Sequence, residues 1–358
     1  MRIEAFAADA PGRRLAPVVR EERAGPGEVL VEVAGCGVCH TDLGFHFEGV
    51  PTRHPYPLTL GHEVSGRVVE AGEGAEAFLG RAVVVPAVLP CGACEACRAG
   101  RGAVCPRQIF PGNDVHGGFA THLRVPARGL CPVPDLGDPR ENPVGLALAD
   151  LSVLADAVST AYQAVLKSGL AAGDLAVFVG AGGVGGFGVG VAAALGAAVV
   201  AIDLDDARLA LLREHGASTT LRADLEFKAL KKEVQAFAKA RGIPTWRRKV
   251  FETSGTPAGQ ATAFGLLEPG GYLGVVGFTP EKVSLRLSNL MAFDARAEGT
   301  WGCLPEHYPA VLGLVLAGKV AVRPFVEHRP LSTINETFED LRAHRARKRV
   351  ILVPGDAS

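Results

Sequence analysis

The chain has 358 residues, of which 48% are hydrophobic and 21% are charged, and its formal net charge at pH 7 is −1. This length suggests two domains that each bury an apolar core, and the balanced charge excludes an overall field that would hold nucleic acid or an anionic membrane. No run of about 18 apolar residues lacks charges or turn residues, and the start MRIEAFAADA contains no long apolar run. We therefore expect no membrane span, no signal peptide and a cytoplasmic protein.

Residues 1–150 alternate short β-branched runs with glycine and proline turns, as in GEVLVEVAGCG, HEVSGRVVEAG, GRAVVVPAVLP and GGFATHLRVP. This spacing, with little helical periodicity, predicts an antiparallel β domain. Around residue 150 the chain becomes rich in Ala and Leu with helical spacing, and we expect this helix to end at Gly169.

Beyond residue 170 the pattern changes to strands that alternate with helices. A strand, a glycine turn, a long helix and a second strand are followed by predicted helices at 205–216 and 224–242 and predicted strands at 247–255 and 271–278. This alternation is typical of a parallel sheet with helices on both faces. The basic run within 228–249 is interleaved with apolar residues, and a solvated helix face is a more common origin for it than an anion contact.

The predicted fold class is therefore α/β with two domains. A mostly antiparallel β-rich catalytic domain would comprise residues 1–155 and 294–358, and a doubly wound parallel-sheet (Rossmann) domain would comprise residues 156–293.

A glycine-rich turn follows the first strand of the predicted Rossmann domain. Gly180, Gly182 and Gly185 form G-x-G-x-x-G between a strand and a helix, and Asp203 stands at the end of the next strand. In this pattern the first glycine permits the tight turn, the second lets the backbone approach a pyrophosphate, and the third lets helix and strand pack closely. The helix N-terminus attracts phosphate, and a carboxylate at Asp203 accepts ribose hydroxyls and repels a 2′-phosphate. NAD is thus favoured over NADP, and the alternative is a turn that binds nothing.

Four cysteines lie close together in PCGACEACRAGRGAVC, at positions 91, 94, 97 and 105. Thiolates at this spacing can surround one tetrahedral Zn²⁺ with no open position, which is a structural rather than a catalytic site. An iron–sulfur cluster takes the same ligands, and four free thiols in one loop would be an oxidation liability.

The stretch GCGVCHTD contains Cys36-Gly-Val-Cys39-His40, which matches c-type haem attachment, half of a zinc ribbon, a redox dithiol, or one metal ligand beside an ordinary cysteine. A catalytic zinc needs about three protein ligands and one open position, and Cys39 together with His62 in LGHEVSG can supply two. Asp42 is placed to fix a histidine tautomer. Taken alone, His62 would more often be a half-buried histidine with local partners.

In their order and spacing, GVCHTD, GHEVSGRVVEAG, the cysteine quartet and GAGGVG…D resemble the zinc-containing alcohol dehydrogenases of the medium-chain dehydrogenase/reductase superfamily, over essentially the whole chain. The resemblance implies a GroES-like catalytic domain, two Zn²⁺ per chain, and NAD⁺-dependent oxidation of a small-molecule alcohol by hydride transfer. It also implies a homo-oligomer, a tetramer or a dimer, with the late strands near 271–290 in contact.

The resemblance further implies roles for individual residues. For the metals and the proton these are Cys39 and His62 as catalytic zinc ligands, Glu63 as a neighbouring acidic residue and a further candidate ligand, Thr41 as the proton relay, and Cys91, Cys94, Cys97 and Cys105 on a structural zinc. For the cofactor they are Gly180, Gly182, Gly183, Val184, Gly185 and Asp203 at NAD, Arg208 beside the adenosine ribose, Val276 and Phe278 along the nicotinamide, and Arg349 at the pyrophosphate. For Val276 and Phe278 the alternative is an ordinary place in the core.

Two positions depart from the family pattern. The third zinc ligand, usually Cys and sometimes Glu, is Asp156 here, in DAVSTAY. A carboxylate can bind zinc and leaves the metal a stronger Lewis acid than a thiolate would, whereas an aspartate that only caps the backbone would leave the zinc weak or absent. Gly44 stands near the place of a frequent histidine, so the outer end of the proton relay is open, and His46 is merely close in sequence.

Within the family, the segment 249–303 and GNDVHGGFATH are similar to the enzymes that oxidise a cyclic hydroxyacyl-CoA, 6-hydroxycyclohex-1-ene-1-carbonyl-CoA. This similarity implies an alcohol that carries a CoA thioester, and free primary or secondary alcohols are the alternative. Three other classes of protein are alternatives. A haem electron carrier would need export from the cytoplasm, and a nucleic-acid-binding zinc module would need a basic face, whereas the cysteine loop has only Arg98 and Arg101 beside Glu95. An inactive relative would bind NAD but oxidise no alcohol.

Overall fold

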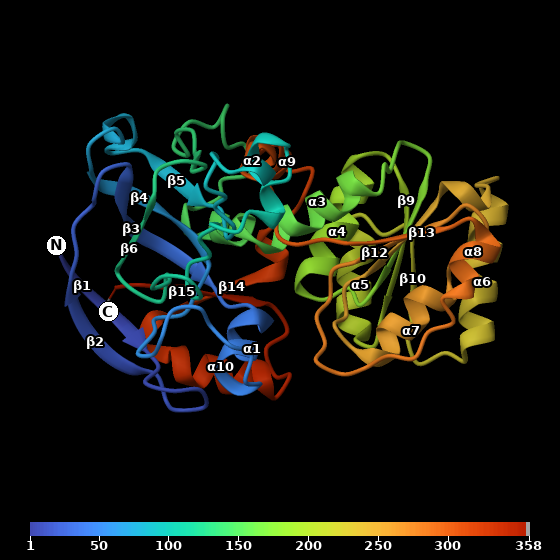
Figure 1. The fold of residues 1–358 in the computed structure, drawn as a ribbon. Helices are drawn as coiled ribbons and strands as arrows, with labels where there is room; N and C mark the ends of the chain where they lie inside the picture. The colour runs from blue at the N-terminus through green and yellow to red at the C-terminus, as the bar shows by residue number, and fades with distance from the viewer. Residues whose placement is uncertain (356–358) are drawn as a thin grey trace. The chain divides into compact units, whose positions relative to one another are not determined.

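The chain leaves its first folding unit after Ser159 and again after Ala317, and it returns both times (Figure 1). In the computed structural model, which describes residues 1–355, unit 1 consists of Met1–Ser159, Gly302–Ala317 and the segment from Val322 onward. Unit 2 consists of Thr160–Trp301 and Gly318–Ala321. Among the residues described, no helix is both long enough and apolar enough to cross a bilayer.

Unit 1 is built on a seven-stranded sheet in the order β14-β15-β3-β4-β5-β7, with β6 also paired to β3. Its pairings are antiparallel except for β14 with β15, so the expected mostly antiparallel domain is confirmed. The strands of the unit are β1 (Arg2–Ala7), β2 (Ala16–Glu21), β3 (Glu28–Gly37), β4 (Glu63–Ala71), β5 (Ala82–Val85), β6 (His122–Pro126), β7 (Cys131–Pro132), β14 (Val326–Pro330) and β15 (Arg349–Val353). Its helices include α1 (His40–Phe47), α2 (Glu95–Arg98), α9 (Tyr308–Leu316) and α10 (Ile334–Arg342).

The alternation of apolar residues along these strands explains the core of unit 1. Val29, Val31 and Val33 of β3 point the same way, because side chains two apart on a strand share a face, and all three are buried. They pack in one cluster with residues of β4, β5 and β6 and with Ile334 and Phe338 of α10. The rigid sheet therefore fixes the ends of β3 and β4.

Unit 2 contains a six-stranded parallel sheet in the order β10-β9-β8-β11-β12-β13. Its strands are β8 (Leu175–Val179), β9 (Ala198–Asp203), β10 (Thr219–Arg222), β11 (Arg248–Glu252), β12 (Tyr272–Val275) and β13 (Arg296–Gly299). Its helices include α4 (Gly183–Ala194), α5 (Asp206–Glu214), α6 (Phe227–Ala240), α7 (Pro257–Gly265) and α8 (Ser288–Phe293), seen around the strands in Figure 1.

The strand order of unit 2 reverses direction between β8 and β11. Right-handed crossovers place the helices of connections that run in opposite directions on opposite faces of a sheet, so the predicted doubly wound arrangement is confirmed. Leu230 and Val234 of α6 and Phe264 of α7 pack on strands β8, β9, β11 and β12 in one buried cluster. The reversal point is where open sheets of this kind bind ligands.

The segment around Asp156 differs from the single helix that its spacing predicts. A 3-10 helix spans Ala149–Ala155, Asp156 follows with φ −139° and ψ −65°, and α3 (Ala157–Lys167) begins afterwards. The expected end near Gly169 is close, because α3 ends at Lys167 and Gly169 has φ +66°. Asp156 thus occupies a break between two helical segments, where the backbone groups lack helical partners.

Candidate metal centres and nucleotide site

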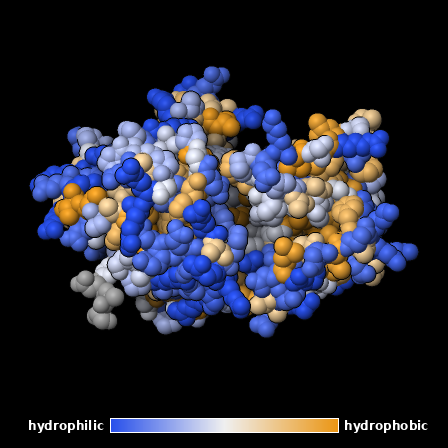
Figure 2. All heavy atoms as spheres, turned by 90° about the horizontal axis from the view of Figure 1, so that it is seen from below, coloured by the Kyte–Doolittle hydropathy of each residue, from blue (hydrophilic) through white to orange (hydrophobic). Residues whose placement is uncertain are grey.

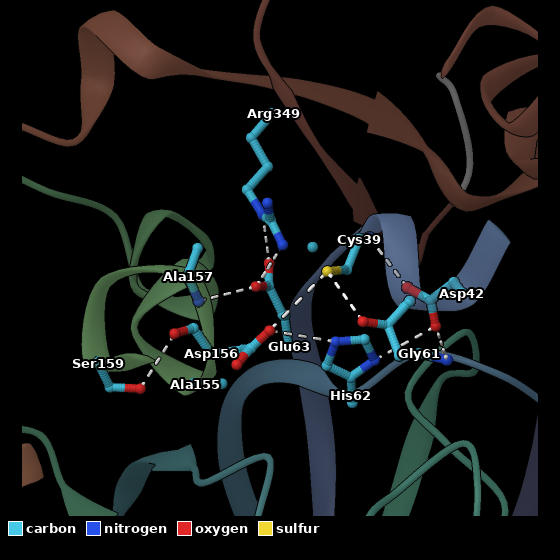
Figure 3. Close-up of polar contacts among 12 residues, drawn as sticks. Cys39, Asp42, Gly61, His62, Glu63, Ala155, Asp156, Ala157, Ser159 and Arg349 are labelled. Atoms are coloured by element: carbon cyan, nitrogen blue, oxygen red, sulfur yellow. Dashed lines mark hydrogen bonds and ion pairs between the residues drawn. The ribbon is translucent and has the colours of Figure 1, made fainter. Parts of the chain in front are cut away.

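Three segments of unit 1 bring Cys39, His62 and Asp156 together. Gly37, at the end of β3, is paired with Glu63, at the start of β4, so Cys39 and His62 lie just beyond one end of this antiparallel pair. The 3-10 helix before Asp156 packs against β3 and β4. Residues far apart in sequence thereby meet beyond the ends of two central strands (Figure 3).

The donor atoms in this cluster have the spacing of a tetrahedral zinc site. Donors about 2.0–2.3 Å from zinc stand about 3.3–3.8 Å apart when their arrangement is tetrahedral. The Sγ of Cys39 lies 3.8 Å from Oδ2 of Asp156, and Nε2 of His62 lies 3.5 Å from the same oxygen. One ligand atom from each of Cys39, His62, Glu63 and Asp156 falls within 4.8 Å of the others. The residues present therefore fit a zinc ion.

Asp42 orients His62 from the side opposite the cluster. Its buried carboxylate accepts the backbone N–H of Cys39 at 2.9 Å and that of Gly61 at 3.1 Å, and its Oδ1 lies 3.3 Å from Nδ1 of His62. Burial alone would lower the pKa of His62, but the carboxylates of Asp42 and Asp156 raise it well above its ordinary value. The site attracts positive charge, and Nε2 is the histidine nitrogen that faces the other donors, as metal binding requires.

Glu63 belongs to the cluster, but its carboxylate already has partners. Arg349 donates Nε to Oε2 at 2.6 Å and Nη2 to Oε1 at 2.5 Å, and the backbone N–H of Ala157 donates to Oε1 at 3.0 Å. We expected Arg349 at the pyrophosphate of the cofactor. In the structure its side chain is 7% exposed and paired with Glu63, because β15 runs beside β3 and brings it to this end of the sheet.

Thr41 lies beside the cluster, on the first turn of α1. Its Oγ1 is 3.6 Å from Sγ of Cys39, and the residue is partly exposed. His46, near the other end of α1, is buried with its ring against Phe47 and Phe338. The structure shows no contact between His46 and Thr41 in the chain it describes, so His46 gains no support as the outer end of a relay.

Cys36 is separate from this cluster. It is a fully buried residue of β3, and burial raises the pKa of its thiol well above the ordinary value. Cys36 belongs to neither group of side chains that could hold a metal among the described residues, and a fully enclosed thiol leaves no room for a haem. The match to C-x-x-C-H therefore carries no haem chemistry here, and Cys39 acts apart from Cys36.

The four cysteines of the 91–105 loop form a second cluster. Sγ of Cys94 lies 3.4 Å from that of Cys97 and 3.7 Å from that of Cys105, and Sγ of Cys91 lies 3.9 Å from that of Cys97. The N–H of Cys91 donates to Sγ of Cys105 at 3.3 Å, and backbone hydrogen bonding, chiefly from Ala93, lowers the pKa of Cys91 to about 6. Thiolates about 3.8 Å apart match a closed tetrahedral zinc site.

The glycine turn of unit 2 has the geometry of a dinucleotide site. Gly180 has φ +85°, and a Cβ there would stand 2.4 Å from Cα of Ser254. A Cβ at Gly185 would stand 2.0 Å from the carbonyl oxygen of Gly180, so close packing of helix and strand requires glycine. At Gly182, which precedes the first residue of α4, a Cβ would have no atom of the described chain within 4 Å. That open space beside a helix N-terminus fits a phosphate group.

Comparisons with known proteins cover most of the chain. Residues 25–135 match the family model of the alcohol dehydrogenase GroES-like domain, and residues 183–317 match that of the zinc-binding dehydrogenase. An alcohol dehydrogenase of Geobacillus stearothermophilus is 31% identical over 330 residues, which is 91% of each chain. An L-threonine 3-dehydrogenase of Pyrococcus abyssi is 31% identical over 339 residues, which is 92% of each chain.

The chain belongs to the zinc-containing alcohol dehydrogenase family. A structure of a cobalt- and zinc-bound thermostable alcohol dehydrogenase from Pyrobaculum aerophilum is 27% identical, covers 99% of this chain and 100% of that one, and has a TM-score of 0.84. The alcohol dehydrogenase of Aeropyrum pernix is 28% identical, with coverages of 98% and 100% and a TM-score of 0.83. As an alcohol dehydrogenase family member, the protein is an NAD-dependent oxidoreductase that acts on a small molecule and binds zinc.

In this dehydrogenase, Asp203 ends β9 next to the glycine turn, as expected. Its Oδ2 accepts the N–H of Ala181 at 2.8 Å, and its Oδ1 accepts the N–H of Asp205 and Nη1 of Arg208, each at 3.0 Å. The carboxylate is thus held in one orientation and shared with the basic residue that the family pattern places beside the ribose. These contacts within the chain fix the orientation of the carboxylate without a bound nucleotide.

The remaining predicted residues of the dehydrogenase lie in unit 2. Val276 and Phe278 follow β12, and Phe278 is 65% exposed, which excludes the alternative that it is a core residue. In the basic run, Arg248 pairs with Glu268, Arg247 with Asp174 at 2.6 Å, and Lys231 donates to the carbonyl of Gly265 at 2.8 Å. These three basic side chains therefore have their partners within unit 2.

Two features of the site escaped the sequence analysis. One is the ion pair between Arg349 and Glu63, and the other is a set of hydroxyl groups around Asp156 from Ser159 and Tyr308. Tyr308 lies in PEHYPAVLG, 152 positions after Asp156. Only the three-dimensional structure relates such distant positions.

Proposed function

We propose that this chain is a zinc-dependent NAD⁺ oxidoreductase that oxidises a secondary alcohol to a ketone, with unit 1 as the catalytic domain and unit 2 as the NAD-binding domain. Cys39, His62 and Asp156 would hold the catalytic zinc, and the four clustered cysteines a structural zinc. The observation that carries the proposal is the spacing of the Cys39, His62 and Asp156 donors, which is that of a tetrahedral metal site. Glu63 would stay outside the metal's ligands, because its oxygens accept Arg349 and Ala157.

The residues of the chain prepare this chemistry. When bound, zinc supplies a Lewis acid that lowers the pKa of an alcohol, and NAD⁺ supplies the hydride acceptor. Asp42 holds His62 with Nε2 toward the other donors. The hydroxyl of Thr41, which lies beside Sγ of Cys39, would accept the substrate proton and pass it outward. The open space at Gly182 would receive the pyrophosphate.

For the substrate, we propose a cyclic hydroxyacyl-CoA, 6-hydroxycyclohex-1-ene-1-carbonyl-CoA. This proposal is supported by the similarity of residues 249–303 to enzymes that use this thioester. The names of the relatives given above indicate other substrates, an alcohol and L-threonine. Free primary or secondary alcohols are therefore the second candidate class.

A screen of NADH formation at 340 nm distinguishes these possibilities. We expect the CoA thioester to react with a kcat/KM at least about tenfold above those of simple alcohols and of L-threonine, and a His62→Ala variant to form no NADH. Activity confined to free alcohols or to L-threonine would refute the thioester but keep the dehydrogenase. A protein that binds NAD yet oxidises none of these compounds would support an inactive relative.

We also propose that the protein is a homo-oligomer, a dimer or a tetramer, with contacts near residues 271–290. Phe278 and Leu287 are 65% and 67% exposed, and Met291 just beyond them is 78% exposed. Figure 2 shows hydrophobic side chains at the surface of the part of the molecule formed by unit 2. Clusters of large exposed apolar side chains mark interaction sites. We expect Leu287→Lys to lower the mass of the particle measured by sedimentation. A variant with the same mass as the wild-type oligomer would show that this surface is not the contact.

A further inference from the structure

The backbone on both sides of Asp156 is held by hydrogen bonds with groups that we do not assign as metal ligands. The carbonyl oxygen of Ala155 accepts the hydroxyl of Tyr308 at 2.5 Å and the N–H of Ala87 at 3.0 Å. The carbonyl oxygen of Asp156 lies 3.2 Å from Oγ of Ser159. The N–H of Ala157 donates to Oε1 of Glu63 at 3.0 Å. Both peptide groups that flank Asp156 are therefore fixed.

These contacts stand where the helical hydrogen bonds stop. Asp156 separates the 3-10 helix Ala149–Ala155 from α3, and its backbone angles are φ −139° and ψ −65°. At such a break the orientation of the peptide groups depends on partners from elsewhere in the fold. Figure 3 shows Ser159, Ala155 and Ala157 around Asp156, with the aspartate side chain directed toward Cys39 and His62.

Tyr308 is the part of this arrangement that comes from furthest along the chain. It is the first residue of α9, it is 2% exposed, and its hydroxyl also lies 3.2 Å from Oγ of Ser159. A buried tyrosine hydroxyl is retained where it has hydrogen-bond partners. Here its partners are the carbonyl of Ala155 and the hydroxyl of Ser159, which itself approaches the carbonyl of Asp156.

The position of the Asp156 carboxylate depends on these peptide groups. Two adjacent peptide planes fix the Cα atom and the direction of its Cα–Cβ bond, and aspartate has only two side-chain torsions with which to correct an error. Ligands must be held to within about 0.5 Å of the productive geometry. The distances of 3.5 and 3.8 Å from Asp156 Oδ2 to the other donors thus require the backbone to stay in place.

We propose that Tyr308 and Ser159 are positioning residues for the Asp156 ligand, and that their hydroxyl groups set the affinity of the Cys39–His62–Asp156 site for zinc. The inference rests on the proposed function, since it presupposes a zinc at that site. Neither residue touches the metal or the substrate, and both act through the backbone of Asp156. The cysteine quartet is independent of them.

Zinc release to a chromogenic chelator tests the proposal with the full-length protein. The release phase that is absent from a Cys39→Ala variant belongs to the Cys39 site, and the remaining phase belongs to the quartet. We expect Tyr308→Phe to speed the Cys39-dependent phase and weaken zinc binding there about tenfold, the lower end of the effect of residues that support metal ligands. Ser159→Ala should shift the same phase in the same direction, and neither variant should alter the quartet phase.

A matched control is available in the same unit. Tyr56→Phe also removes a tyrosine hydroxyl that donates to a backbone carbonyl, at 3.2 Å, but this carbonyl belongs to Phe45 of α1 and not to a neighbour of Asp156. We expect its zinc release to equal that of the wild type. Equal effects of Tyr56→Phe and Tyr308→Phe would overturn the proposal in favour of a general stability effect, which thermal unfolding would record alongside.

The outcomes separate this inference from the proposed function. If wild-type protein shows no Cys39-dependent zinc, the metal site itself is wrong and both fail. If that zinc is present and neither Tyr308→Phe nor Ser159→Ala changes its release, only the positioning role is refuted. Should Tyr308→Phe not fold, Ser159→Ala alone decides the question.

Discussion

Thr41 is the residue whose role is most open to a direct test. Its hydroxyl lies next to Sγ of Cys39, and a general acid–base group contributes about 10²–10⁴ to the rate. We expect Thr41→Ala to lower kcat by about 100-fold or more while the Kd for NAD, measured by quenching of protein fluorescence, is unchanged. Thr41→Ser keeps the hydroxyl and should retain most of the activity. Equal turnover of Thr41→Ala and wild type would remove Thr41 from the relay.

Asp203 carries the expected preference for NAD. The residue is 8% exposed and ends β9, and its carboxylate is held by two backbone N–H groups beside the glycine turn. We expect Asp203→Asn to raise the ratio of kcat/KM for NADP to that for NAD by about tenfold, or ~1.4 kcal/mol. Asp206→Asn removes the same charge from the nearby start of α5, where the side chain is 80% exposed, and serves as the control. An unchanged ratio in Asp203→Asn would contradict the assignment.

Local spacing in the sequence was enough to group several residues that the structure brings together. Each of these patterns is local in the sequence and has a physical reason for every position: the spacing of the four cysteines, the three-residue step from Cys39 to Asp42, and the three glycines of the turn. Arg349 and Tyr308 show where that reasoning stops. Their partners, Glu63 and Ala155, are 286 and 153 positions away, and a single sequence carries no signal for such pairs.

At the scale of elements, the turn between β8 and α4 offers a paired test. Gly185→Ala would place a methyl group 2.0 Å from the carbonyl oxygen of Gly180, so we expect it to cost about 1–3 kcal/mol of folding free energy. Gly182→Ala meets no described atom within 4 Å, so its unfolding temperature should match the wild type while its affinity for NAD falls.

Thermal unfolding without NAD and titration with NAD measure the two effects separately. NAD binding by Gly182→Ala that equals the wild type would show that the open space beside α4 does not receive the pyrophosphate. A wild-type unfolding temperature for Gly185→Ala would show that the turn relaxes around an added methyl group.

Most elements were predictable because their hydrophobic period is clear. β3 is a short valine-rich run, and the apolar residues of α6 recur at helical spacing, so both types were identified. The break at Asp156 was not predicted. Its neighbours have continuous helical spacing without glycine or proline, and the partners that hold the break open, such as Tyr308 and Glu63, come from other parts of unit 1.

At the scale of the whole molecule, the change from alternating strands to strand–helix repeats near residue 150 predicted the two-domain α/β class. The return of the chain to unit 1 at Gly302 left a weaker signal, because the segments that follow combine short helices with two strands, β14 and β15, that complete a sheet begun 300 residues earlier. Sheet completion of this kind depends on pairing between distant strands, which composition does not reveal.

The central claim is that one chain holds two zinc ions, of which one is bound by Cys39, His62 and Asp156. Zinc content per chain, measured by mass spectrometry of the purified protein, tests it most directly. We predict two zinc ions per chain for the wild type and one for a Cys39→Ala variant that keeps the cysteine quartet. One zinc ion in both proteins would contradict the catalytic site and leave only the structural one.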